Sequence, residues 1–129
     1  MQAEYDRNEM DALSKNVIGC AYAVSNALGA GFLEKVYENA LAHELAKRGF
    51  RVAQQYPLDV MYDGVVVGQY VADLLVEGVL LAELKAVQAL ESTHMAQCLN
   101  YLKATGLRLC LLMNFGKSRV EVQRVVHDF

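Results

Sequence analysis

The stretch from Tyr70 to Val87 (YVADLLVEGVLLAELKAV) most constrains the fold, because it carries charged residues inside two apolar runs. Asp73 lies in the first run, and Glu83 and Lys85 lie in the second. Between the runs, Glu77-Gly78 is typical of a turn. Side chains alternate between the faces of a strand, so Glu83 and Lys85 share one face. Because a buried charge is costly unless it is paired or holds a metal, we expect these charges to be paired or to surround an ion.

The length of the turn decides whether the two carboxylates share a face of the sheet. A two-residue loop at Glu77-Gly78 would pair Asp73 with Ala82 and place Asp73 and Glu83 on opposite faces. A three-residue loop, or a bulge at Gly78, would place Asp73 opposite Glu83 and direct both carboxylates into one pocket. We predict this second register. Carboxylates on opposite faces would exclude a shared metal site.

The whole chain predicts an α/β (α+β) fold in one domain spanning residues 1–129. At 129 residues and 54% hydrophobic composition, it is long enough for one core and too short for two. Periodicity and apolar runs predict helices over about 8–28, 32–48 and 91–105, and strands over about 51–62, 65–76, 79–87, 107–115 and 120–126. Pro57 indicates that the first strand lies at a sheet edge or is kinked. The order α-α-β-β-β-α-β-β indicates a mixed sheet with helices packed on it.

Composition narrows the possible locations and partners. No apolar run approaches the roughly 20 residues that span a bilayer, and the polar start lacks the pattern of a signal peptide, so we expect a cytoplasmic protein without a membrane partner. The three cysteines are odd in number and widely spaced, which indicates free thiols. A net charge of −3 gives no general basic surface, so a nucleic-acid partner requires a local patch or a bridging cation.

The polar residues of the second predicted helix can be explained either by helix stability and packing or by a functional site. Its expected apolar face begins with Leu33, Val36 and Tyr37, and Glu34 and Glu38 lie one turn apart along the edge of that face. Acidic residues in a first turn complement the helix dipole, which explains Glu34 and Glu38 without a functional site. Tyr37 is either a core residue or a donor of a hydrogen bond to a nearby carboxylate.

Two converging carboxylates would form an oxygen-lined site that suits Mg²⁺ or Mn²⁺. Such an ion orients a water molecule and neutralises the charge that builds on a phosphate. Lys85, beside Glu83, would position or activate the attacking water or stabilise the developing charge. With Asp73 on the preceding strand and Gln97 on the following helix, the set predicts phosphodiester hydrolysis.

Five segments then form a specific pattern. They are GFLEKVYENAL (31–41), YVADLLVE (70–77), ELKAV (83–87), HMAQCLNYLKATG (94–106) and LLMNFG (111–116). Together they resemble the bacterial GxxExxY family of the PD-(D/E)XK nuclease-like superfamily, over roughly residues 13–126. The family name is read at Gly31, Glu34 and Tyr37. The resemblance implies a restriction-endonuclease-like mixed central sheet flanked by helices, and a Mg²⁺-dependent or Mn²⁺-dependent nuclease whose partner is nucleic acid, DNA rather than RNA.

The resemblance also implies roles for individual residues. Asp73, Glu83 and Lys85 fill the metal and catalytic triad, and Ala72 stands where the superfamily name has a proline, which bears no ligand atom. Glu34 corresponds to the frequent acidic residue of the N-terminal helix, as a catalytic residue and a further metal ligand.

A second motif of the resemblance lies on the helix over about 91–105. Gln97 and Tyr101 resemble the QxxxY motif of the exonuclease branch related to RecB, in which that helix approaches the site and the nucleic acid. Gln97 is therefore a candidate catalytic and substrate-binding residue, and Tyr101 a candidate substrate-binding residue. Tyr37 is a further substrate-binding candidate.

Two classes of function stay open at this point, beside a structural reading in which Asp73 and Lys85 only form a buried pair in a scaffold of unknown role. The first is a nuclease, for which a homodimer is expected because two-fold symmetry suits cleavage of both strands of a duplex. The alternative is a catalytically inactive nucleic-acid-binding or protein-binding module that retains the nuclease fold. Oxygens of Asp73 and Glu83 within joint reach of one cation favour the nuclease, whereas closed ion pairs with Lys85 and an arginine favour the module.

Overall fold

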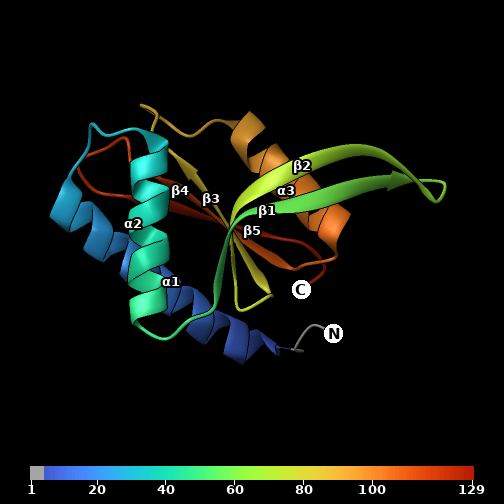
Figure 1. Ribbon diagram of the computed structural model, residues 1–129, viewed down its shortest axis with the longest axis horizontal. Coiled ribbons are helices and arrows are strands. Elements are labelled where there is room, and N and C mark those ends of the chain that lie inside the picture. Colours follow the sequence, from blue (N-terminus) through green and yellow to red (C-terminus); the bar gives the residue numbers. More distant parts are fainter. Residues whose placement is uncertain (1–4) are drawn as a thin grey trace.

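The computed structural model describes residues 5–129, in which three helices surround a five-stranded sheet (Figure 1). In chain order the elements are α1 (Arg7–Leu28), α2 (Glu34–Lys47), β1 (Val52–Tyr62), β2 (Val65–Val76), β3 (Leu80–Lys85), α3 (Ser92–Thr105), β4 (Leu109–Asn114) and β5 (Glu121–Val126). The expected order of elements and the mixed, restriction-endonuclease-like architecture are confirmed. Over the same residues, no helix combines the length and the apolar character that crossing a membrane requires.

The sheet has the strand order β1-β2-β3-β4-β5. Among the described strands, β3 and β4 run parallel, and the other neighbouring pairs run antiparallel. A parallel pair needs a long crossover connection, and α3 supplies it. Strand β1, which contains Pro57, lies at an edge of the sheet, as expected for a residue that cannot donate to a ladder.

Each face of the sheet carries its own core. Helices α1 and α2 cover one face, and α3 covers the other (Figure 1). The alternation of side chains along β3 divides its residues between the two layers. Leu84 packs beneath α1 and α2, whereas Leu81 packs beneath α3. Glu83 and Lys85, at odd positions like Leu81, therefore belong to the face that α3 covers.

The buried face of α2 differs from the predicted one. Leu33 and Val36 are 79% and 38% exposed, so their expected place in the core was wrong. The buried face of α2 consists of Tyr37, Glu38, Leu41, Ala42 and Leu45. This rotation turns Glu38 inward, although the sequence placed it only at the edge of the apolar face.

The turn between β2 and β3 has the length that a shared site requires. Val76 pairs with Leu80, and the register continues to Leu74 opposite Ala82, so three residues form the loop. One further step along both strands places Asp73 opposite Glu83. Glu77 and Gly78 have φ values of 54° and 69°, and such left-handed conformations are tolerated most easily by glycine. The predicted register is confirmed.

The β1–β2 hairpin bends over α3 at the position of Asp73. Leu74 packs on the side of α1 and α2, whereas Ala72, two residues earlier, packs with Leu58 on the side of α3. Opposite Asp73, Gln55 on β1 has a φ of 54°, a left-handed value that is uncommon in a strand. Figure 1 shows the hairpin arching past α3 and projecting beyond the rest of the molecule.

Gly116 fixes the segment that leaves β3 after Lys85. A Cβ atom at Gly116 would overlap the backbone N and O atoms of Val87. We expect Gly116→Ala to lower the free energy of unfolding by about 1–3 kcal/mol through this overlap, measured by urea denaturation. Gly68→Ala is the matched control, because no atom lies within 4 Å of a Cβ built at Gly68. Equal stability of the two variants would contradict the close approach of Gly116 to Val87.

Candidate functional site

The carboxylates of Asp73 and Glu83 meet where β2 separates from β3. Glu83 Oε1 accepts a hydrogen bond from the backbone N–H of Asp73 at 2.7 Å, and Asp73 Oδ2 accepts one from the backbone N–H of Leu84 at 2.8 Å. The two side chains thus satisfy backbone donors that no longer pair within the ladder beyond Leu74 and Ala82. Each carboxylate is fixed through one oxygen. The second oxygen of Glu83 accepts no hydrogen bond within residues 5–129, and that of Asp73 accepts only a long one, from Gln55 Nε2 at 3.5 Å.

Both carboxyl groups have raised pKa values. Burial raises the pKa of Glu83 to about 8, and the negative charge of Asp73 acts in the same direction. Burial also raises the pKa of Asp73, with the charges of Glu38 and Glu34 adding to the effect. Among the described residues, neither Asp73 nor Glu83 forms a salt bridge. The site therefore concentrates carboxyl groups that no protein cation directly pairs.

Lys85 is held by α3 rather than by the carboxylates. Its Nζ donates a hydrogen bond to Gln97 Oε1 at 3.3 Å. Lys85 is near enough for its charge to lower the pKa of Asp73 and Glu83, an effect that burial outweighs. An ammonium group carries three donors, so Lys85 keeps donors for a group bound beside the carboxylates. The closed ion-pair cluster that would favour a binding module is not formed among residues 5–129.

The donor set of Asp73 and Glu83 fits a hard divalent cation. In the described part of the chain, the one buried side-chain oxygen or nitrogen without a hydrogen bond belongs to Glu121, so the second oxygens of Asp73 and Glu83 are either accessible to solvent or hydrogen-bonded. Within residues 5–129, no three His, Cys, Asp or Glu side chains are grouped closely enough to hold an ion together. Waters and phosphate oxygens would therefore complete a coordination shell begun by Asp73 and Glu83.

Helix α2 brings two glutamates toward this pair. Glu34, at the first turn of α2, is exposed and raises the pKa of both Asp73 and Glu83 through its charge. The described structure does not bring Glu34 close enough to form a three-carboxylate group with the pair. A role for Glu34 as a metal ligand or catalytic residue stays a prediction. Glu38, one turn later, is buried with an exposed fraction of 4%.

A polar cluster around Glu38 was not foreseen from the sequence. Glu38 Oε2 accepts hydrogen bonds from Lys35 Nζ at 3.0 Å and Gln54 Nε2 at 2.8 Å, and Glu38 Oε1 accepts one from Gln55 Nε2 at 2.7 Å. Gln55 Nε2 also lies 3.5 Å from Asp73 Oδ1, so Gln55 links the buried glutamate to the site. Gln55 also has a left-handed backbone, with a φ of 54°. This conformation is strained at a residue other than glycine, and such strained residues cluster at functional sites. Consecutive glutamines within a strand were the signal available in the sequence.

Tyr37 lies in the core rather than in the site. It has no exposed surface, and its ring stacks on Phe115 with the ring centroids 4.8 Å apart. Its hydroxyl donates a hydrogen bond to the carbonyl oxygen of Gly29 at 2.5 Å, and not to Glu34 or Asp73. Tyr37 thereby orders the loop that leads into α2, and the structure does not bring it together with the other candidate residues.

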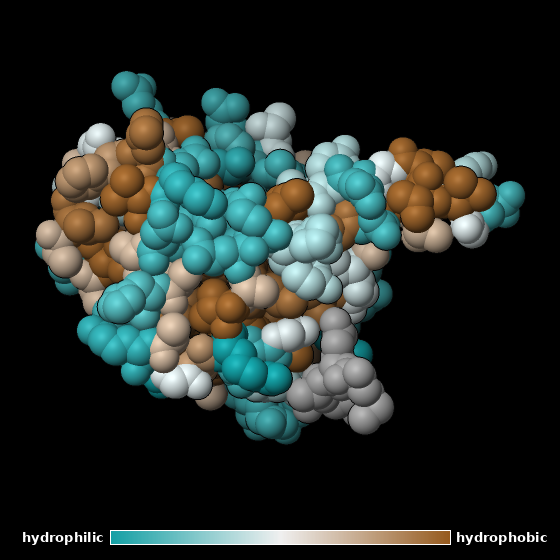
Figure 2. Space-filling model, in the orientation of Figure 1, coloured by the Kyte–Doolittle hydropathy of each residue, from teal (hydrophilic) through white to brown (hydrophobic). Residues whose placement is uncertain are grey.

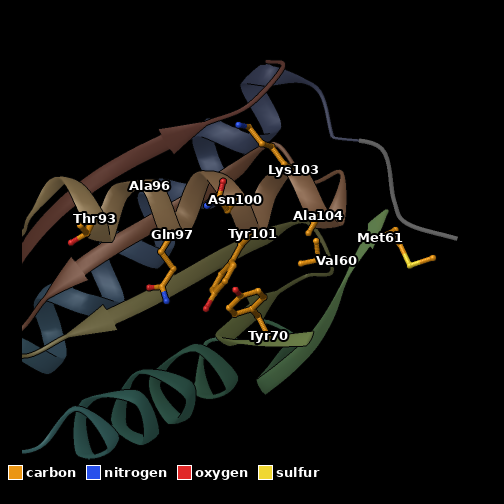
Figure 3. Close-up of a pocket in the computed structure, with 10 residues that line it drawn as sticks. All are labelled: Val60, Met61, Tyr70, Thr93, Ala96, Gln97, Asn100, Tyr101, Lys103 and Ala104. Carbon is orange, nitrogen blue, oxygen red and sulfur yellow. The ribbon is translucent and has the colours of Figure 1, made fainter. Parts of the chain in front are cut away.

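A groove beside the carboxylates lies between α3 and the bent hairpin. Its volume is about 690 Å³, and Gln97 and Tyr101 both line it (Figure 3). Burial raises the pKa of Tyr101 to about 12, and the charges of Glu83 and Asp73 contribute to the rise. Gln97 and Tyr101 extend from the same side of α3 in Figure 3, next to Tyr70. The structure therefore brings the QxxxY residues to the edge of the carboxylate pair.

The mixed sheet, the facing carboxylates and the lysine two positions after the second carboxylate define a restriction-endonuclease-like protein. A family model described as the PD-(D/E)XK nuclease superfamily matches residues 11–125. The chain belongs to this superfamily. No curated protein and no solved structure matches the chain.

Proposed function

We propose that the protein is a metal-dependent nuclease that hydrolyses phosphodiester bonds in nucleic acid, with DNA preferred to RNA. The observation that carries the proposal is the facing pair Asp73 and Glu83, in which each carboxylate is oriented by a backbone N–H and neither is neutralised by Lys85. Membership in the nuclease superfamily supports it. The closer likeness to the GxxExxY family, the single domain over residues 1–129 and the cytoplasmic location belong to the same proposal.

The residues of the site divide the chemistry between them. Asp73 and Glu83 would hold Mg²⁺ or Mn²⁺, which supplies charge neutralisation at the phosphate and lowers the pKa of a water molecule. Lys85, oriented by Gln97, donates hydrogen bonds to the attacking water or to a phosphate oxygen and stabilises the charge that develops in the transition state. Gln97 thus positions the lysine, and its amide nitrogen is left to contact the substrate.

Calorimetric titration with Mn²⁺ tests the shared site. We expect the parent to bind Mn²⁺, and Asp73→Asn and Glu83→Gln each to lose binding, because each variant removes one of two anionic ligands. Asp59→Asn is the control, since Asp59 is an exposed carboxylate on β1 whose partner is Gln69. Binding that persists in both site variants would remove the metal site. Cleavage of DNA or RNA that persists in Glu83→Gln would belong to a contaminant.

The alternative function is a binding module that retains the nuclease fold without catalysis. Its support is the net charge of −3, which gives little general attraction for a phosphate backbone. The unpaired state of Asp73 and Glu83 among the described residues favours the nuclease over this alternative.

A homodimer is also part of the proposal. The tip of the projecting hairpin exposes large apolar side chains, which Figure 2 shows as a hydrophobic surface at the far end of the projection. They are Met61, Tyr62, Val65, Val66 and Val67. Contiguous exposed apolar surface is typical of interaction sites, and light scattering on the purified protein tests whether two copies associate.

A further inference from the structure

The groove between α3 and the bent hairpin continues from the candidate metal site. Gln97 belongs to both, because its Oε1 accepts a hydrogen bond from Lys85 and its side chain lines the groove. Tyr101, one turn further along α3, is close enough to the carboxylates for their charges to raise its pKa. A nucleic-acid strand with a phosphate at Asp73 and Glu83 would therefore lead its next nucleotide into this groove.

One wall of the groove offers a flat aromatic surface. Tyr70, on β2, is 51% exposed, whereas Tyr101 behind it is 5% exposed. Their ring centroids are 5.7 Å apart and the rings are inclined by 45°, so Tyr101 supports Tyr70 from the inner side (Figure 3). An exposed ring that is held in place by a buried one suits stacking with a nucleobase, because every base has a π face.

The opposite wall supplies polar groups at helical spacing. Gln97 and Asn100 bear amides that both donate and accept hydrogen bonds, which suits base edges and phosphate oxygens. Lys103 is a further lining residue, six residues after Gln97, which is about 9 Å along the helix axis and about 120° around it, so it extends from another side of α3 (Figure 3). Lys103 forms no salt bridge within residues 5–129.

We propose that this groove binds an unpaired nucleotide next to the phosphate at Asp73 and Glu83, so that the preferred ligand is single-stranded nucleic acid. The volume of about 690 Å³ lies in the range of roughly 300–1,000 Å³ found for small-molecule sites, which suits a single nucleotide, and the exposed face of Tyr70 can stack only on a base that is not already stacked in a duplex. Stacking needs no positive charge, so it supplies affinity to a chain with a net charge of −3. The inference rests on the proposed nuclease function for the place of the phosphate.

Binding of a short single-stranded DNA of mixed sequence, labelled with 2-aminopurine, tests the groove. Measured with Mn²⁺ in a Lys85→Met background to limit cleavage, Tyr70→Ala should weaken binding about 5-fold to 100-fold and abolish the fluorescence change caused by stacking. Tyr70→Phe should retain both, since it keeps the ring. Tyr22→Ala, which removes a partly exposed tyrosine on α1, is the control and should bind as its background does. The matching duplex should bind more weakly than the single strand.

The outcomes separate this inference from the nuclease proposal. Unchanged binding in Tyr70→Ala, or absence of binding to the single strand, overturns the groove as a nucleotide site. If the parent nevertheless cleaves duplex nucleic acid with Mn²⁺, the nuclease proposal stands alone. If the single strand binds through Tyr70 and the parent cleaves nothing, the groove stands and the nuclease proposal falls.

Discussion

Replacing Lys85 by methionine should lower metal-dependent cleavage of nucleic acid by about 10²-fold to 10³-fold while leaving Mn²⁺ binding in place. Methionine keeps an unbranched apolar side chain and removes the ammonium group. Because Lys85 Nζ is bonded to Gln97 and forms no salt bridge with Asp73 or Glu83, its loss does not leave a carboxylate deprived of an ion-pair partner. The substitution should therefore lower the rate of cleavage and leave the affinity for Mn²⁺ unchanged.

Cleavage rates at saturating Mg²⁺, together with calorimetry in Mn²⁺, separate these two effects for Lys85→Met. The matched control is Lys47→Met, which removes an exposed lysine on α2 that pairs with Glu44, and it should leave cleavage unchanged. Loss of Mn²⁺ binding in Lys85→Met would contradict the assigned role and make the lysine a support of the carboxylates.

In the metal-free protein, the free energy of unfolding should decrease as the pH rises from about 5 to 8. Glu83 has an ordinary pKa of 4.5 and a pKa of about 8 in the folded chain, so the folded state holds a proton that the unfolded state loses. This contribution is fully present below the unfolded value, declines by up to about 1.4 kcal/mol per pH unit, and is lost above the folded value. The raised pKa of Asp73 acts in the same direction.

The variant Glu83→Gln isolates this effect, because it keeps the shape of the side chain and removes its charge. In EDTA at pH 8 we expect it to be more stable than the parent by about 2–4 kcal/mol, with the difference shrinking toward pH 5. Urea denaturation at several pH values measures both proteins. Added Mn²⁺ should stabilise the parent and not the variant, since a ligand stabilises the state that binds it. If the stability of Glu83→Gln depended on pH as strongly as that of the parent, the effect would have to come from other titratable groups.

The sequence could predict the parts of the site that short-range geometry determines. Alternation along one strand fixes that Glu83 and Lys85 share a face, and a count of loop residues fixes that Asp73 faces Glu83. These features depend on residues close together in the chain. Helical spacing likewise places Gln97 and Tyr101 on neighbouring turns of α3.

Long-range contacts explain what the sequence could not predict. Glu38 is buried because Gln54 and Gln55, more than a dozen residues later, donate hydrogen bonds to it. The spacing of residues along α2 does not indicate those partners. The apolar residues Leu33 and Val36 were therefore predicted to lie on its buried face. The bend of the hairpin at Gln55 could not be predicted either, because the sequences of β1 and β2 each look like a regular strand. The bend changes which face of the sheet the following side chains point to.

The three-residue length of the turn between β2 and β3 determines which residues of the two strands share a face of the sheet. Exposed turns generally tolerate insertions and deletions. Here a change of one residue would exchange odd for even positions on one strand relative to the other, and would separate Asp73 from Glu83 across the thickness of the sheet. The residues of this turn are constrained by their own backbone and packing, because Gly78 has a positive φ and Val79 is buried. The length of the turn is tied in addition to the chemistry of two residues that it never touches.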